Sequence, residues 1–189
     1  MKYTTHQAGY SLVEVLVAIS ILLIATVGPM TIAARSLQYA QFSAQQNTAF
    51  FLAQEGVEAI FAIRGDDGLA HLDNPTSNDS WAWTTDSALS DCRDSTGCGI
   101  DWRDDTLISN IVACTGSNCL LNYNASANRA RYSHLSGDAT PYTRVITLDD
   151  VSPTEVEVVS TVSWEGAGSQ GPRSVVLQTY LQDIYDTSP

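Results

Sequence analysis

The chain is poor in positive charge. Nine of its 189 residues are Lys or Arg and 21 are Asp or Glu, so the formal net charge is −12. Lys2 is the only lysine, and basic side chains nowhere cluster with interleaved aromatics. Proteins that bind nucleic acids use such clusters to neutralise phosphates. The composition therefore argues against nucleic-acid binding by the folded domain.

Sequence motifs of common catalytic sites are also missing. The chain has no Gly-x-Ser-x-Gly turn, no phosphate-binding glycine loop and no His-Glu-x-x-His helix. Of the three histidines, His6 is near the N-terminus, while His71 and His134 lie in polar stretches without a nucleophile nearby, where we expect exposed side chains. We predict that the chain is not an enzyme and needs no cofactor.

Cysteine is scarce but even in number. Cys92 and Cys98 are close in sequence, as are Cys114 and Cys119. Four cysteines allow three pairings, and the spacing favours the two local loops, Cys92–Cys98 and Cys114–Cys119. A zinc site is the alternative, although the spacings lack the tight Cys-x-x-Cys of such sites. We expect two disulfides and no metal.

The middle of the chain is acidic. Ten aspartates and two arginines lie between Asp66 and Asp105. Asp, Asn and Ser bond their own backbone in turns, so we expect an irregular surface excursion over residues 65–141, held by the cysteines. A calcium site is the alternative, because carboxylates suit a hard cation, although no ordered Asp-x-Asp-x-Asp-Gly loop is present. The core of the excursion is expected to contain Trp81, Trp83 and Trp102.

One long apolar run dominates the N-terminal part. Between Gly9 and Ala34 the only acidic or basic side chain is Glu14. Tyr10 to Met30 is long enough to cross a hydrocarbon core about 30 Å thick as a helix. A secretory signal peptide would have a shorter apolar core, and a simple single-pass anchor is the other alternative. Lys2 on the N-terminal flank predicts that this end stays in the cytoplasm.

The helix is expected to continue over residues 31–64. Gly28-Pro29 predicts a kink or local melting, because proline removes one backbone hydrogen bond. Beyond it, apolar residues recur at spacings of three and four, and Gly65-Asp-Asp-Gly68 is expected to end the helix. The apolar residues of this stripe are Phe50, Ala53, Val57, Ile60 and Phe61.

The C-terminal part, residues 142–189, alternates with period two. Tyr142 to Leu148, Glu155 to Trp164 and Ser174 to Gln182 read as strands separated by turn-forming residues. They predict an antiparallel meander with one apolar face, and the helix stripe would cover that face. The expected fold class is α+β, a long N-terminal helix packed on a C-terminal antiparallel sheet.

The start of the apolar run resembles a known family. Gly9-Tyr-Ser-Leu-Val-Glu14 followed by an apolar helix resembles the prepilin signal of type IV pilins, type II secretion pseudopilins and their competence relatives. The resemblance implies cleavage after Gly9, methylation of the new N-terminus at Tyr10, and pairing of Glu14 with a terminal amine during assembly. Two departures are Tyr10, where the family usually has phenylalanine, and Ala8, where it usually has a basic residue. Phe51 to Ile60 and the strand pattern of the tail are also similar to minor pilins.

Together these features predict a structural filament subunit of a pilin-like fold. Residues 1–9 would be a prepilin leader and residues 10–30 a transmembrane helix in the bacterial inner membrane, with the remainder exported. The resemblance implies other pilin or pseudopilin subunits, a prepilin peptidase and methyltransferase, an inner-membrane assembly platform and membrane lipid as partners. The alternative is a single-pass membrane-anchored binding or adhesion module that does not polymerise. The sequence does not distinguish a pilus from a secretion or DNA-uptake machine.

Overall fold

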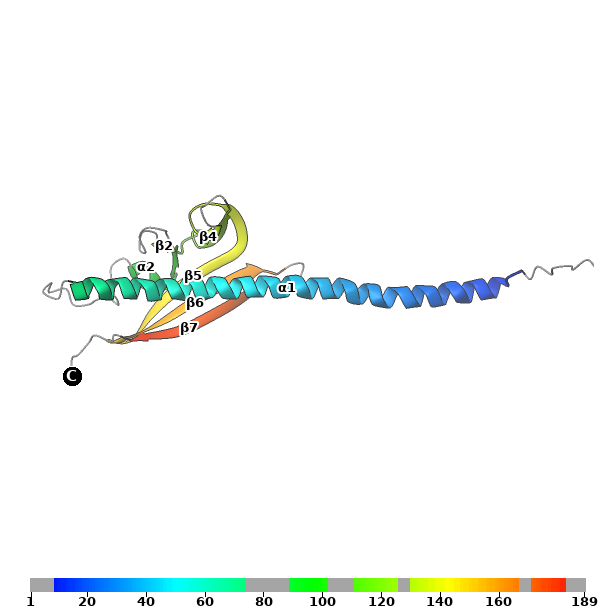
Figure 1. Cartoon of the computed structure of the whole chain (residues 1–189), viewed down its shortest axis with the longest axis horizontal. Coiled ribbons are helices and arrows are strands. Elements are labelled where there is room, and N and C mark those ends of the chain that lie inside the picture. Colours follow the sequence, from blue (N-terminus) through cyan, green and yellow to red (C-terminus); the bar gives the residue numbers. More distant parts are fainter. Residues whose placement is uncertain (1–8, 74–88, 102–110, 126–129, 167–170, 183–189) are drawn as a thin grey trace, which may run out of the picture. The chain divides into compact units, whose positions relative to one another are not determined.

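A computed structural model describes residues 9–73, 89–101, 111–125, 130–166 and 171–182, except for the side chains of residues 67 and 70–73. Contacts divide the chain into two compact units, Met1–Ala44 and Gln45–Pro189. Helix α1, Leu12–Asp73, contributes to both units. The described strands and a short helix all belong to the second unit (Figure 1).

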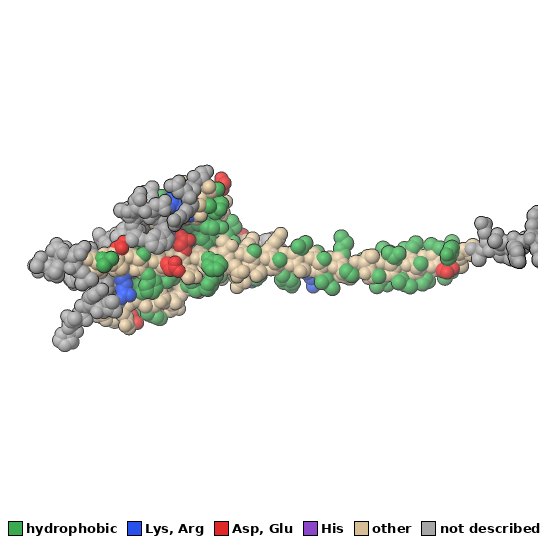
Figure 2. Space-filling model, in the orientation of Figure 1, with side chains coloured by type: hydrophobic (Ala, Val, Ile, Leu, Met, Phe, Trp, Pro, Cys, Tyr) green, Lys and Arg blue, Asp and Glu red, His purple; other side chains and the backbone are tan. Residues whose placement is uncertain are grey.

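The described part of the first unit is an apolar helix. Its large hydrophobic side chains are exposed on every side, and hydrophobic groups follow one another along it in Figure 2. By length and hydropathy this helix can cross a membrane. The hydroxyls of Ser20 and Thr26 donate to the carbonyls of Leu16 and Leu22, at 2.8 and 3.0 Å. This is the backbone bonding predicted for hydroxyl side chains in an apolar helix.

Pro29 does not interrupt α1, so the prediction of local melting is wrong. Proline lacks the backbone N–H that would bond the carbonyl four residues earlier, at Ala25. Nearby, the hydroxyl of Thr31 donates to the carbonyl of Gly28 at 2.8 Å. Helix α1 continues through Pro29 despite the lost bond.

The second unit contains one antiparallel sheet. Strands β5, Asp138–Ser152, β6, Glu155–Glu165, and β7, Pro172–Gln182, form the predicted meander (Figure 1). The other edge of β5 pairs with β3, Leu120–Asn124, and with β1, Cys98–Ile100. Two further strands, β2, Ile111–Ala113, and β4, Arg131–Ser133, pair with β1 and β3. The sheet thus has four more strands than the sequence predicted.

These four strands and the short helix α2, Ser90–Arg93, lie in the region expected to be irregular. Each of the four strands has three to five residues. Alternation over so few positions does not stand out from the surrounding polar sequence. Pairing with the long strand β5 is what makes part of this region regular.

The core forms where α1 packs on one face of the sheet. Alternate residues of β5 and β6 are buried, as the period-two pattern predicted. The central cluster consists of Ala59, Ile60, Ile63, Leu89, Cys92, Cys98, Ile100, Ile146, Leu148, Val156, Val158 and Leu181. The helix approaches the sheet closely at Gly56, where an added Cβ would lie 2.6 Å from the Ser160 hydroxyl and 3.2 Å from Ile146 Cδ1. Glycine is therefore required at this crossing by the lack of space.

Helix α1 ends at Asp73 and not at Arg64, where the sequence predicted its end. Gly65 and Gly68 each weaken a helix by about 1 kcal/mol, but neither blocks its backbone bonds as proline would. Tertiary contacts offset that cost, since Arg64 donates through Nη2 to the carbonyl of Gln182 at 2.5 Å and Gly68 is buried. His71 accordingly belongs to the last turn of the helix and not to a loop.

We predict that Gly56→Ala destabilises the second unit by about 1–3 kcal/mol, because the new methyl group collides with the sheet. Gly65→Ala is the matched control, since nothing lies within 4 Å of its added Cβ and helix propensity favours alanine. Thermal unfolding of the full chain in detergent should show a lower midpoint for Gly56→Ala and an equal or higher one for Gly65→Ala. Equal midpoints for Gly56→Ala and the parent chain would show that the helix does not approach the sheet so closely.

Candidate functional site

The residues of the prepilin-like motif surround the start of α1. Gly9 and Tyr10 precede the helix and are exposed, with Tyr10 at 82%. The backbone N–H of Val15 donates to the carbonyl of Ser11 at 3.2 Å, which starts the helical bonding pattern. Glu14 is the acidic residue of the first turn and is also exposed. The structure therefore brings a potential cleavage point and a carboxylate to the same helix end.

The charge of Glu14 has little compensation within its own unit. The unpaired N–H groups of the first helical turn favour an anion by about 0.3–1 kcal/mol. Among the described residues of the first unit, Arg35 is the only basic side chain. It is 21 positions along the helix from Glu14, which corresponds to roughly 30 Å. Within the described residues of this unit, Glu14 therefore has no basic side chain closer to it along the helix.

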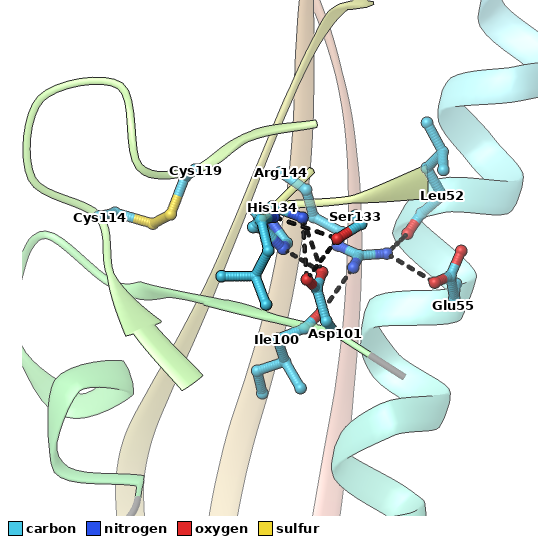
Figure 3. Close-up of polar contacts among 10 residues, drawn as sticks. Leu52, Glu55, Ile100, Asp101, Cys114, Cys119, Ser133, His134 and Arg144 are labelled. Atoms are coloured by element: carbon cyan, nitrogen blue, oxygen red, sulfur yellow. Dashed lines mark hydrogen bonds and ion pairs between the residues drawn. A yellow bond between two sulfur atoms is a disulfide. The ribbon is translucent and has the colours of Figure 1, made fainter. Parts of the chain in front are cut away.

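A second polar cluster lies inside the second unit, around the buried Arg144 of β5 (Figure 3). Its guanidinium donates to the carbonyl of Leu52 at 3.2 Å and to that of Ile100 at 2.6 Å. Glu55 lies 3.4 Å away and is partly exposed. Arg144 thus ties the helix to β1 and β5. Sequence reasoning missed it, although its place among the inward residues of an alternating strand could have indicated a buried arginine.

Asp101 and His134 form the neighbouring polar contact (Figure 3). Asp101 Oδ1 lies 2.6 Å from His134 Nδ1, and the backbone N–H of His134 donates to the same carboxylate at 2.9 Å. The His134 ring is almost fully buried and packs against Gly99, where an added Cβ would lie 2.8 Å from the ring. The prediction of an exposed His134 is therefore wrong, because the Asp101 carboxylate supplies a buried partner for the imidazole.

These residues do not form a nucleophilic triad. The hydroxyl of Ser133 donates to Asp101 Oδ2 at 2.9 Å instead of to the imidazole. His134 Nε2 is buried without a hydrogen-bond partner among the described residues. A serine nucleophile needs an imidazole nitrogen within reach to accept its proton. The cluster joins the end of β1 to the turn after β4.

The charge on Asp101 is stabilised by this geometry. Burial raises the pKa of its carboxyl, but the hydrogen bond and charge interaction with His134 and the bond from Ser133 outweigh burial, so the net pKa is lowered. A carboxylate whose pKa is lower in the folded state stabilises that state above its unfolded pKa, which is about 3.9 for Asp. The stabilisation is lost as the pH falls through the folded pKa.

Both disulfides lie in the second unit. Cys92 is joined to Cys98, and Cys114 to Cys119. This is the local pairing that the spacing favoured. Cys92–Cys98 joins α2 to the first residue of β1 and is buried in the central cluster. The second disulfide closes the turn between β2 and β3, as Figure 3 shows. Gly97 precedes β1 with φ of +69°, a left-handed conformation that favours glycine.

The alternative of a metal site finds no candidate in the described ranges, which contain no group of three His, Cys, Asp or Glu side chains suited to an ion. Much of the acidic stretch considered for calcium lies outside the described residues. The same holds for Trp81, Trp83 and Trp102, which were expected to form a small core.

We predict that Asp101→Asn lowers the free energy of unfolding by about 1–3 kcal/mol near pH 7, because it removes the charged partner of a buried imidazole. The difference from the parent should shrink below about pH 4, where the unfolded carboxyl is protonated and the folded one begins to be. Thermal midpoints at pH 7 and pH 3.5 measure it, and Asp91→Asn, an exposed residue of α2, is the control. A pH-independent difference would mean that the carboxylate charge contributes nothing.

A comparison with family models finds one motif, at the residues that surround the start of α1. Residues 4–28 match the prokaryotic N-terminal methylation motif. No curated protein and no solved structure matches the chain. The matched segment contains Gly9, Tyr10 and Glu14 together with most of the apolar helix. The motif and the apolar helix together point to membrane anchoring, and proteins with this motif are structural and not enzymatic. The N-terminal part of this chain is thus the prepilin motif of the type IV pilin-like proteins.

Proposed function

We propose that the chain is a structural subunit, of the minor-pilin or pseudopilin kind, in a type IV pilus-like or type II secretion filament. The observation that carries this proposal is the placement of Glu14 in the first turn of an exposed apolar helix, directly after Gly9 and Tyr10 and within the matched motif. An exposed apolar helix suits lipid before assembly and other helices afterwards.

Maturation would start at the exposed end of the helix. A prepilin peptidase would cleave after Gly9 and leave Tyr10 as the methylated N-terminus. Cleavage also removes Lys2, so the mature chain would contain no lysine side chain. Its terminal amine would then be the only cation near the depth of Glu14, since Arg35 is roughly 30 Å away along the helix. The mature chain would stay in the inner membrane, with its second unit exported, until the assembly platform extracts it.

Assembly would change the environment of Glu14. In the membrane the carboxylate lies near the interface, where it can be hydrated. Among packed apolar helices an unpaired carboxylate costs several kcal/mol and must be neutralised or paired. The terminal amine of Tyr10, from the same or a neighbouring subunit, is the partner we propose. This pairing would make the carboxylate a requirement for assembly but not for insertion.

The first test concerns processing. Gly9→Ala should reduce cleavage and leave an uncleaved chain in the membrane, because the added methyl group occupies the position next to the scissile bond. Intact-mass analysis of membrane extracts should show the parent without residues 1–9 and the variant with them. A parent chain that keeps these residues in cells with an active prepilin peptidase would contradict the proposed maturation.

The second test concerns Glu14. Glu14→Ala and Glu14→Gln should be cleaved and inserted normally but enter filaments at least about tenfold less, which corresponds to about 1.4 kcal/mol. Glu14→Asp should be partly tolerated, because the charge remains on a shorter side chain. Thr26→Ala is the matched control, since its hydroxyl already bonds carbonyls of its own helix.

Immunoblots of sheared filaments, normalised to total membrane protein, give the incorporated fraction. Equal incorporation of Glu14→Ala and the parent would show that the carboxylate does not dock the subunit. Absence of the parent from filaments would favour the other candidate, a membrane-anchored binding module that does not polymerise.

A further inference from the structure

The sheet of the exported unit has one long open edge. Strand β7 pairs only with β6 among the described strands, over eleven residues. The outermost strands at the opposite side, β2 and β4, have three residues each. Natural sheets protect long edges with charges, prolines, bulges or covering segments. In β7 the proline and the one charge are confined to the start, at Pro172 and Arg173, and residues 174–182 carry no charge.

The backbone groups at this edge have a defined direction. The carbonyl of Gln182 accepts a hydrogen bond from Arg64 and therefore points away from β6. Backbone groups of successive strand residues point to alternate sides, so those of Ser174, Val176, Gln178 and Tyr180 also point outward. Pro172 belongs to the same outward-pointing set of alternate residues. The N–H that proline lacks would therefore not have bonded β6. Within the described part of the chain, no other backbone group bonds this outward set.

The apolar layer between the helix and the sheet is partly exposed on the side where β7 lies. The bond from Arg64 to Gln182 places one flank of α1 beside β7. Phe61, Val57 and Phe50 precede Arg64 by three, seven and fourteen positions, so they lie on that flank. Phe50 and Phe61 are 45% and 44% exposed. Figure 2 shows hydrophobic side chains gathered where the helix lies beside the sheet.

The sheet beneath this flank is incompletely covered. Three residues of β7 that face the helix side are only half-buried, namely Val175, Leu177 and Thr179. Their partners on β6, Val162, Ser160 and Val158, are fully buried. The side chains thus change from buried to half-buried between two neighbouring strands that are about 5 Å apart. An eighth strand beside β7 would place its own inward side chains under Phe50, Val57 and Phe61.

We propose that β7 accepts an added strand, an extended segment of a neighbouring subunit in the filament, so this inference rests on the proposed function. Four outward residues offer about eight backbone hydrogen bonds, because each supplies one donor and one acceptor. The segment would be uncharged along its centre and apolar at alternate positions, to match the uncharged edge and the exposed phenylalanines.

Charge explains why a neighbouring subunit fits at this edge. The chain carries a net charge of −12, so copies of it repel one another over most of their surface. Residues 174–182 of β7 carry no charge themselves, and Arg173 and Arg64 lie near the two ends. The Glu157 carboxylate of β6 accepts hydrogen bonds from Gln178 and Tyr180. The arginines at the two ends attract another acidic chain, and β7 itself adds no carboxylate. Exposed aromatic side chains beside an open edge then add apolar contact to the backbone bonds.

Residue-resolved hydrogen exchange tests the added strand. In the full chain in detergent, the outward amides of Val176, Gln178 and Tyr180 should exchange at least about tenfold faster than the inward amides of Val175, Leu177 and Thr179. In sheared filaments the outward amides should slow by at least about tenfold. Outward amides that stay fast in filaments would overturn the inference. So would outward amides that are already protected in dilute detergent, since the chain itself would then cover the edge.

Edge variants separate this inference from the proposed function. Val176→Lys places a charge on the open strand and Gln178→Pro removes one outward N–H, while Val176→Thr is the control that keeps a β-branched, uncharged residue. Both edge variants should keep the parent's thermal midpoint within a few degrees and enter filaments about tenfold less, whereas the control enters normally. Normal incorporation of both folded edge variants, with Glu14→Ala still excluded, would overturn the added strand and leave the filament role intact. Absence of the parent from filaments would overturn both.

Discussion

The close packing of α1 on the sheet at Gly56 determines most of the second unit. At this crossing the helix backbone lies against Ser160 and Ile146, and the buried Arg144 bonds a helix carbonyl one turn away. The same guanidinium bonds the carbonyl of Ile100, so β1 is held beside the helix as well. A bulkier residue at position 56 would move the helix away from the sheet and lengthen these bonds together. The core and the buried polar contacts therefore depend on one short approach between helix and sheet.

The same helix meets two different requirements along its length. In the first unit its apolar side chains are exposed all round, which suits lipid or other helices. From Ala49 to Ile63 one face is buried on the sheet, and the buried positions recur at spacings of three and four. The sequence shows this change directly, as an unbroken apolar run followed by an amphipathic one. The first part serves anchoring and, as we propose, assembly, while the second part packs on the sheet of the second unit.

The elements that the sequence predicted well are the long periodic ones. The helix and the strands β5, β6 and β7 all appear near the expected residues, because periodicity is evident over seven or more positions in each. The four short strands escaped prediction, since each needs β5 or a neighbour to form. The burial of Asp101 and His134 was not predicted either. Each is a polar side chain that can be buried only with a hydrogen-bond partner, and the partner lies 33 positions away in the sequence. The prepilin motif was visible because its signal lies in adjacent residues.

Mass spectrometry of the N-terminal peptide from purified filaments decides whether this chain is a processed filament subunit. Because Lys2 would be lost with the leader, the terminal amine is the only amine that such an experiment has to assign. We expect a peptide that begins at Tyr10 and carries a methyl group on its terminal nitrogen. Filaments that lack this peptide, while membranes contain a chain that still begins before Gly9, would rule out a processed filament subunit.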